Sequence, residues 1–192
     1  QGKVRYGGVC NYQAWQVCRA LWVQERINAA PLITVQNPYS LLNRSLEQEM
    51  FPLARALGLG VMAYAPLGTG LLSGAYAPGE PPPAATLWGR RGADRLQQTL
   101  SGQAADVLAV VRDVAERSGA TAAQVALRWV LSRPEITVAI SGADTDAQID
   151  ENLRAVDLQI APEDVARLEE VSAGLGMFLD GPQITARGPR ST

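Results

Sequence analysis

The stretch Leu57–Tyr76, LGLGVMAYAPLGTGLLSGAY, decides the fold. Its apolar run Leu59–Ala63 has the length and bulk of a buried parallel strand. The run ends at Tyr64 and opens into a loop that contains Gly68, Gly70 and Gly74. Ligands of α/β proteins sit at the carboxyl ends of such strands, because loops there vary while the sheet stays rigid. An aromatic ring followed by open backbone amides suits a flat, phosphate-bearing ligand. A plain glycine-rich turn after a core strand is the alternative.

Further apolar and β-branched runs alternate with segments of helical period on both sides of this stretch. Strands are expected at 4–9, 32–36 and 136–140, and helices at 12–28, 46–57, 104–117, 121–131, 145–155 and 163–172. The alternation predicts an α/β fold with a parallel sheet of about four strands, flanking helices and right-handed crossovers. An open doubly wound sheet and half of a (β/α)8 barrel both fit, and periodicity does not separate them.

Local signals predict where these helices begin and end. Asn11 is suited to cap the first helix, and Ser45 with Gln48 resembles a capping box for the second. Thr121 is the expected cap of a later helix, and Gly58 the expected stop of the second.

The four tryptophans fall into two groups. Trp15, Trp22 and Trp129 occupy helix positions, which predicts that they belong to the core. Trp88 lies instead within Ala77–Gly102, a long segment with three consecutive prolines and no clear period, which predicts a functional or mobile loop. There Trp88 is either a lid aromatic or an ordinary anchor of the loop.

Composition excludes several classes of function. The chain has 192 residues, 17 basic and 19 acidic side chains and no histidine. We expect no nucleic-acid partner, because the basic residues do not cluster, and no membrane span, because no apolar run approaches about 20 residues. The absence of histidine excludes a Ser-His-Asp triad, a histidine-ligated zinc site and a histidine acid or base within these residues.

The two cysteines, Cys10 and Cys18, form no CxxC pair and are expected to stay reduced in a cytoplasmic protein. Residues 1–174 are expected to form one partial barrel domain and 175–192 a flexible tail. Because the chain begins at Gln1 and not at Met, we expect a fragment or a processed product.

The glycine loop is not a dinucleotide fingerprint, because Gly68, Gly70 and Gly74 are spaced GxGxxxG and follow the third strand. Such glycines can still bind phosphate through their N–H groups. Gly142, before a helix, offers a second anion site. The expected strand ends carry Cys10-Asn11, Gln36, Tyr64 and Ser141-Gly142. Each is more often structural when taken alone, but together they predict one ligand site across the carboxyl edge of the sheet.

Five ordered segments resemble the C-terminal half of an aldo-keto reductase. They are GKVRYGGVCNY at 2–12, ITVQNPYSLLNR at 33–44, GVMAYAPLGTGLLSG at 60–74, TAAQVALRWVLSRP at 121–134 and SGADTDAQIDEN at 141–152. The likeness is greatest to the branch that includes general aldehyde and ketone reductases and potassium-channel β subunits. It implies half of a (β/α)8 (TIM) barrel that binds NADP(H) and reduces a small aldehyde or ketone to an alcohol.

The resemblance also implies roles for individual residues. Asn11 and Gln36 would hold the nicotinamide carboxamide with help from Cys10, and Tyr64 would stack on the nicotinamide ring. The pyrophosphate would be lined by Ala65, Leu67, Gly68 and Gly70. The adenosine end would be held by Gly142, Gln148, Glu151 and Asn152.

Three departures from the family pattern affect these implications. The family's catalytic Asp, Tyr, Lys and His belong to strands that would precede this chain, so no catalytic residue is assigned and this chain alone is expected to be inactive. Cys10 replaces a usual Ser, and Ala75 a frequent Lys. Asp144 stands where a basic or small polar residue often meets the 2′-phosphate, which makes NAD(H) the alternative cofactor.

Two other readings stay open. The chain is alternatively a non-catalytic half-barrel that binds a nucleotide or a partner subunit, or a half that is completed in trans. A half-barrel exposes two sheet edges, which predicts self-association.

Overall fold

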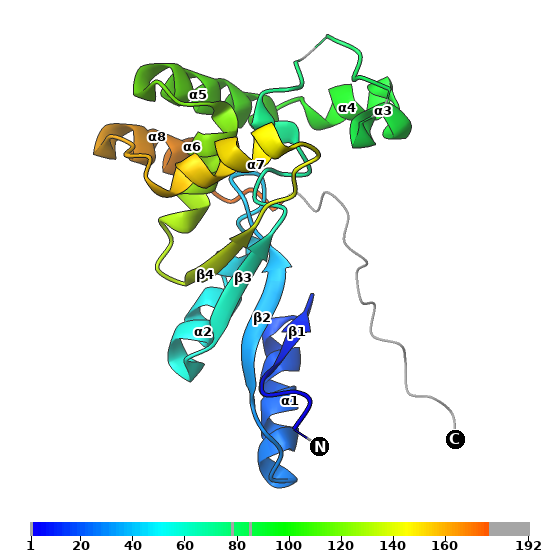
Figure 1. Cartoon of the computed structure of the whole chain (residues 1–192), viewed down its shortest axis with the longest axis vertical. Coiled ribbons are helices and arrows are strands. Elements are labelled where there is room, and N and C mark those ends of the chain that lie inside the picture. The colour runs from blue at the N-terminus through cyan, green and yellow to red at the C-terminus, as the bar shows by residue number, and fades with distance from the viewer. Residues whose placement is uncertain (1, 78, 85, 177–192) are drawn as a thin grey trace.

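A computed structural model describes residues 2–77, 79–84 and 86–176. Its centre is one parallel sheet in the order β1-β2-β3-β4, formed by β1 (Gly7–Cys10), β2 (Leu32–Pro38), β3 (Gly60–Tyr64) and β4 (Ile136–Ile140) (Figure 1). Each strand lies beside the next one in the sequence. A doubly wound sheet reverses its strand order part of the way through, whereas a (β/α)8 barrel does not. The order therefore confirms the α/β prediction and favours the partial barrel.

Helices follow the strands as the periodicity predicts. The longer helices are α1 (Ala14–Arg26), α2 (Met50–Leu57), α5 (Gln103–Ser118), α6 (Ala122–Leu131), α7 (Asp146–Leu153) and α8 (Pro162–Ser172). Short helical turns are α3 (Leu87–Arg91), α4 (Ala93–Thr99), η1 (Ser45–Glu47), η2 (Leu71–Ser73) and η3 (Arg154–Val156).

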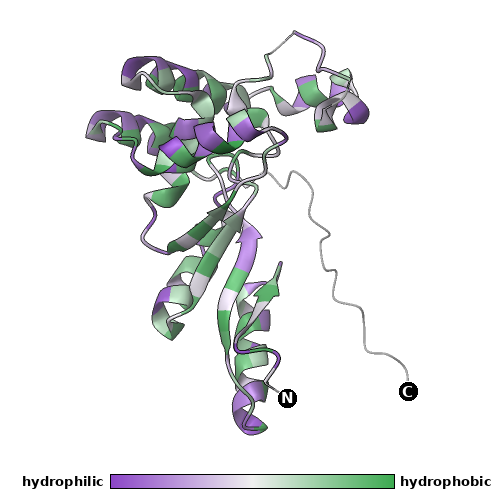
Figure 2. Ribbon diagram, viewed as in Figure 1, coloured by the Kyte–Doolittle hydropathy of each residue, from purple (hydrophilic) through white to green (hydrophobic). Residues whose placement is uncertain are grey.

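The sheet has one covered face and one partly open face. Val35, Val61 and Ala63 are fully buried in the hydrophobic core. Gln36 and Met62 alternate with them along the strands and are only partly buried. In Figure 2 the strands are mainly green, but the arrowhead of β2 is purple. Polarity on the central strands is therefore concentrated at their carboxyl ends.

Two predicted helix signals are confirmed and two are wrong. Thr121 and Gln124 form the capping box of α6, and Gly58 ends α2 in the left-handed conformation. Asn11 does not cap α1, because the cap is Gln13 and Asn11 itself has a positive φ of 57°. Ser45 begins the 3-10 turn η1 instead of capping α2. Its side chain hydrogen-bonds to the side-chain oxygen of Asn43, so it is occupied within the loop.

The prediction that Trp15 and Trp22 belong to the core is wrong. Their exposed fractions are 51% and 55%, whereas Trp129 is 1% exposed. Both lie on α1, which follows β1, and β1 pairs only with β2 among the described strands. Periodicity identifies the apolar face of a helix, but it does not say whether another element covers that face.

The segment Ala77–Gly102 is more ordered than the prediction of a loop, because it contains α3 and α4. Trp88 is 1% exposed, and its indole N–H donates to the carbonyl of Thr69 over 3.1 Å. Trp88 is therefore an anchor that ties this segment to the glycine loop.

The expected tail lies mostly outside the described residues, which end at Gly176. At its start the carbonyl of Leu175 accepts a hydrogen bond from the backbone N–H of Arg44, and Gly176 forms a β-bridge with Asn43. The chain after α8 thus returns to the loop that follows β2.

Candidate functional site

Asn11 lies at the carboxyl edge of the sheet, directly after the edge strand β1. Its backbone N–H donates to the carbonyl of Gln36 on the neighbouring strand over 2.9 Å. Its side-chain oxygen accepts a 2.8 Å hydrogen bond from the hydroxyl of Tyr64, which ends β3. Parallel pairing places Cys10 opposite Gln36 and so brings the ends of three strands together. The structure therefore gathers Cys10, Asn11, Gln36 and Tyr64 at one edge.

Tyr64 is half-buried at this edge. Burial raises the pKa of its phenol and the nearby Cys10 raises it further, while the hydrogen bond with Asn11 acts in the opposite direction. Because the net shift is upward from an ordinary pKa of 10.0, the phenol is protonated at neutral pH. Tyr64 thus acts as a hydrogen-bond donor and presents a partly accessible ring.

The glycine loop after Tyr64 has an unusual backbone. Ala65 and Thr69 have positive φ angles of 52° and 55°, and Gly68 and Gly70 are also in the left-handed region. The N–H of Gly68 donates to Ala65, and that of Gly70 to Leu67. These two amides close the loop's own turns, so a phosphate group would have to contact the loop through other donors. The loop is held in shape in advance of any ligand.

A second group of predicted residues surrounds the end of β4. Thr145 caps α7 by accepting from the N–H of Gln148, and the side-chain oxygen of Gln148 accepts from the N–H of Asp144 over 2.7 Å. Asn152 donates to the hydroxyl of Ser141 over 3.2 Å. A Cβ atom at Gly142 would meet nothing within 4 Å.

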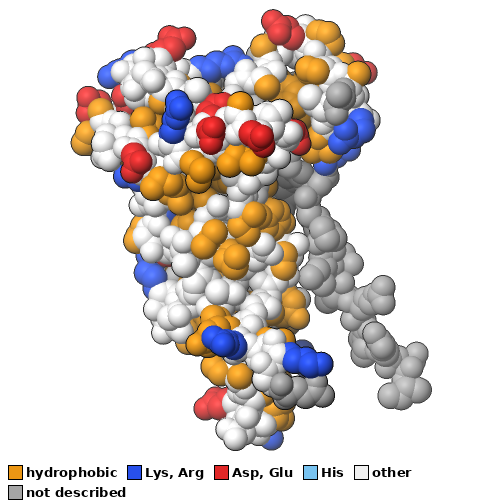
Figure 3. Space-filling view, in the orientation of Figure 1, with side chains coloured by type: hydrophobic (Ala, Val, Ile, Leu, Met, Phe, Trp, Pro, Cys, Tyr) orange, Lys and Arg blue, Asp and Glu red, His pale blue; other side chains and the backbone are white. Residues whose placement is uncertain are grey.

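Glu151 belongs to the same segment, and its carbonyl accepts a hydrogen bond from Gln124. Register pairing of Tyr64 with Ile140 places this group beside the end of β3. Figure 3 shows acidic side chains gathered over α7, and the segment 141–153 contains four carboxylates and no Lys or Arg.

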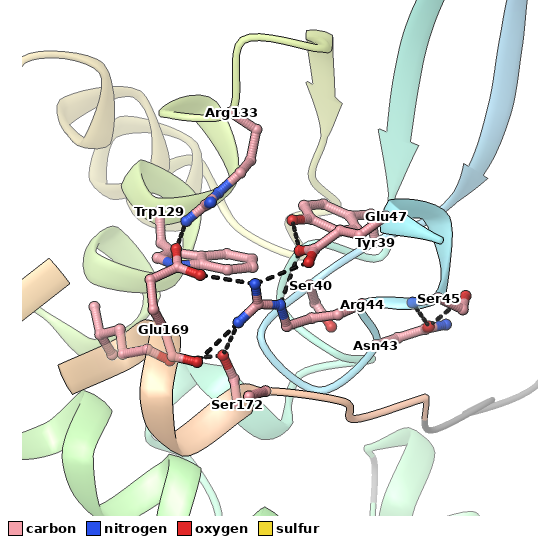
Figure 4. Close-up of polar contacts among 12 residues, drawn as sticks. Tyr39, Ser40, Asn43, Arg44, Ser45, Glu47, Trp129, Arg133, Glu169 and Ser172 are labelled. Carbon is pink, nitrogen blue, oxygen red and sulfur yellow. Dashed lines mark hydrogen bonds and ion pairs between the residues drawn. The ribbon is translucent and has the colours of Figure 1, made fainter. Parts of the chain in front are cut away.

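A polar network that the sequence prediction missed supports this edge from the loop after β2 (Figure 4). Arg44 forms ion pairs with Glu47 at 2.8 Å and with Glu169 of α8 at 2.7 Å. It also donates to the Ser172 hydroxyl over 3.1 Å. The side chain of Arg44 is 11% exposed, so these contacts are largely shielded from water.

Aromatic rings complete the network. The ring of Tyr39 stacks on Trp129 with centroids 5.4 Å apart, and the Trp129 indole donates to Glu169 over 2.9 Å. The Tyr39 hydroxyl donates to Glu47, and the Tyr39 backbone N–H donates to the carbonyl of Tyr64. The network therefore fixes the loop after β2 and, through it, the end of β3. Tyr39 and Arg44 belong to the sequence segment NPYSLLNR, which indicates a family resemblance but does not by itself predict this network.

The pKa values within this network follow from burial and hydrogen bonding. Burial and the neighbouring Glu47 raise the pKa of Tyr39 far above its ordinary value. Burial opposes ionisation of Glu47, but hydrogen bonds from Arg44 and Tyr39 outweigh it and hold the pKa of Glu47 below 4.5. Glu47 is therefore a carboxylate at neutral pH.

Across residues 2–77, 79–84 and 86–176, no group of three or more Cys, Asp or Glu side chains is placed to hold a metal ion. Within the same ranges, no helix has the length and apolar character needed to cross a membrane.

Comparison with known proteins identifies the family. Protein tas of Escherichia coli (strain K12) is 36% identical over 172 residues, which cover 88% of this chain and 48% of that protein. The "Uncharacterized oxidoreductase YrpG" of Bacillus subtilis (strain 168) is 35% identical over 175 residues, 91% of this chain and 51% of its own. A "Probable voltage-gated potassium channel subunit beta" of Oryza sativa subsp. japonica is 30% identical over 173 residues, which cover 88% of this chain and 53% of that protein.

The chain thus spans about half the length of these curated relatives. The sequence profile of the Aldo/keto reductase family matches residues 1–173. The chain belongs to the aldo/keto reductase family.

Proposed function

We propose that this chain forms the nicotinamide-cofactor site of an NADP(H)-dependent oxidoreductase that reduces aldehydes or ketones to alcohols. The observation that carries the proposal is the grouping of Asn11, Gln36 and Tyr64 at the carboxyl edge of the sheet. Side-chain amides offer both donors and acceptors, which suits recognition of a carboxamide. A cytoplasmic location accords with free Cys10 and Cys18.

The arrangement of Asn11 fits a nicotinamide. Its side-chain oxygen accepts from the Tyr64 hydroxyl, so the orientation of the amide is fixed and its NH2 group would donate to the carboxamide oxygen. Gln36 would complete the carboxamide contact, and the ring of Tyr64 would stack on the nicotinamide. When bound, the reduced nicotinamide supplies a hydride to the substrate carbonyl. The residues of this chain bind and orient the cofactor, and the resemblance assigns proton transfer to residues outside this chain.

The other two parts of the cofactor would lie along the neighbouring loops. The pyrophosphate would be lined by Ala65, Leu67, Gly68 and Gly70, with hydrogen bonds from donors other than the Gly68 and Gly70 amides. The adenosine end would lie against Gly142, Gln148, Glu151 and Asn152, where the absence of a Cβ atom at Gly142 leaves room.

Cofactor preference is decided at the adenosine end. The resemblance implies NADP(H), whereas the carboxylate of Asp144 would repel a 2′-phosphate and could accept a hydrogen bond from a 2′-hydroxyl. We expect Asp144→Ser to strengthen NADPH binding about tenfold relative to NADH, a change of about 1.4 kcal/mol. Fluorescence titrations with NADPH and NADH measure the ratio of the two affinities. An unchanged ratio would show that Asp144 does not determine cofactor preference.

A second candidate function is a non-catalytic module that binds a nucleotide or another subunit. The exposed Trp15 and Trp22 favour it, because they lie on a surface of α1 that another chain could cover. Among the described strands β1 and β4 each pair with one neighbour, so self-association is also proposed. NADPH oxidation in the presence of an aldehyde, measured after the chain is mixed with a fragment that carries the family's catalytic residues, separates the enzyme from the module. Size-exclusion chromatography measures self-association.

A further inference from the structure

Asn37 is a polar residue on the buried face of the sheet. Along β2 and β3 this face also carries Val35, Val61 and Ala63, which are fully buried. Asn37 is 7% exposed, and its register partner on β3 is Ala63. A buried polar group is costly unless it is hydrogen-bonded, and an aliphatic side chain would serve packing alone at least as well. The contacts of Asn37 therefore require a reason other than core packing.

The side chain of Asn37 holds the turn that contains Asn11. Its NH2 group donates to the carbonyl of Tyr12 over 3.2 Å. Its side-chain oxygen has no hydrogen-bond partner within the part of the chain that the structure describes. The opposite orientation of the amide would place two oxygens against each other at Tyr12. Asn37 therefore serves as a donor to the chain immediately after Asn11.

The turn at Asn11 needs such support. Asn11 has a φ of 57°, a left-handed conformation that costs energy in residues other than glycine, although Asn tolerates it better than most. Gln36 accepts from the backbone of Asn11, and Tyr64 donates to its side chain. Asn37 adds a third contact through its side chain. Two neighbouring residues of β2 thus hold the turn, Gln36 through its backbone carbonyl and Asn37 through its amide.

We propose that Asn37 is a positioning residue for the nicotinamide end of the cofactor site. This inference rests on the proposed function. Asn37 is buried behind the strand and acts through the backbone of Tyr12, which sets the direction of the Asn11 amide. Loss of the Asn37 donor frees the turn, so the carboxamide loses its oriented partner. The pyrophosphate and adenosine contacts lie on other loops and keep their geometry.

The test compares NADPH with 2′-phospho-ADP-ribose, which is the same molecule without nicotinamide. Both are titrated against the full 192-residue chain and its Asn37→Leu and Asn37→Ser variants. Leu removes the donor, and Ser keeps a shorter one. We expect Asn37→Leu to weaken NADPH binding about fivefold to tenfold, the equivalent of one hydrogen bond, and to leave 2′-phospho-ADP-ribose binding within twofold. Asn37→Ser should fall between Asn37→Leu and the wild type for NADPH.

The control is Asp164→Asn, which alters a buried polar residue (3% exposed) on α8, away from the carboxyl edge of the sheet. It should leave the ratio of the two affinities unchanged. If Asn37→Leu weakens both ligands equally, or neither, the positioning role is wrong. If Asn37→Leu does not fold, the ratio of the NADPH and 2′-phospho-ADP-ribose affinities of Asn37→Ser decides whether Asn37 has the positioning role. Failure of the wild-type chain to bind NADPH at all would instead overturn the proposed function.

Discussion

The hydroxyl of Tyr64 donates a 2.8 Å hydrogen bond to the side-chain oxygen of Asn11. Tyr64 ends β3 and Asn11 follows β1, so this bond crosses the end of β2 that lies between them. It links two residues that are 53 positions apart in the sequence. The bond therefore holds the ends of β1 and β3 together at the proposed nicotinamide position.

Removal of the Tyr64 hydroxyl should weaken the connection between the ends of β1 and β3 while keeping the aromatic ring. We expect Tyr64→Phe to weaken NADPH binding about threefold to tenfold, because one half-buried hydrogen bond contributes about 0.5–1.5 kcal/mol. NADPH fluorescence titration measures the change. Tyr6→Phe is the matched control, because Tyr6 is 72% exposed and precedes β1. Equal affinities of Tyr64→Phe and the wild type would show that the bond does not orient the site.

The Arg44 network makes a separate prediction about stability. Arg44→Met removes a cation from between Glu47 and Glu169. Glu47 then keeps the Tyr39 hydroxyl but loses its ion pair, whereas Glu169 keeps Arg133 and the Trp129 indole. We expect the free energy of unfolding to fall by about 2–4 kcal/mol, as measured by urea denaturation. Arg26→Ala is the control, because Arg26 is exposed and contacts only the face of Trp22 in the described contacts. It should cost less than about 1 kcal/mol. Similar losses in both variants would contradict a structural role for the network.

The same network predicts how stability depends on pH. The pKa of Glu47 is lower in the folded chain than its ordinary 4.5, so its contribution to stability is present above pH 4.5 and is lost as the pH falls through the folded pKa. The pKa of Tyr39 is raised from 10.0, so its contribution is present below pH 10 and is lost at higher pH.

Urea denaturation from below pH 4.5 to above pH 10 measures both limbs. Glu47→Gln should flatten the acid limb and Tyr39→Phe the alkaline limb. If either variant leaves its limb as steep as in the wild type, the titration belongs to another group.

Local signals predicted much of the fold because they depend on short stretches of chain. The Thr121 capping box and the Gly58 helix end need only a few neighbouring residues, and both are present. Ser45 has the same local pattern, but its side chain is taken by Asn43 in a tight loop, a tertiary effect that the pattern does not contain. Trp15 is exposed for a related reason, since its helix lies at an edge of the described sheet.

The site was predictable at the level of strand ends and not at the level of hydrogen bonds. Parallel strands bring their carboxyl ends to one edge, so Asn11, Gln36 and Tyr64 could be grouped from the sequence. The use of the Gly68 and Gly70 amides inside their own loop depends on backbone angles that the sequence does not display. The role of Asn37 was hidden because the predicted strand ended at residue 36, whereas β2 continues to Pro38 and places Asn37 on the buried face of the sheet.

The most direct test of the account is NADPH titration of the wild-type chain beside Gln36→Ala and Gln159→Ala. Gln36 belongs to the proposed carboxamide site, whereas Gln159 is exposed in the segment before α8. We expect saturable binding to the wild type, at least fivefold weaker binding to Gln36→Ala, and no change for Gln159→Ala, because a buried amide contact contributes about 1 kcal/mol or more. No saturable binding to the wild type, or equal affinity in all three proteins, would contradict a nicotinamide site at this edge of the sheet.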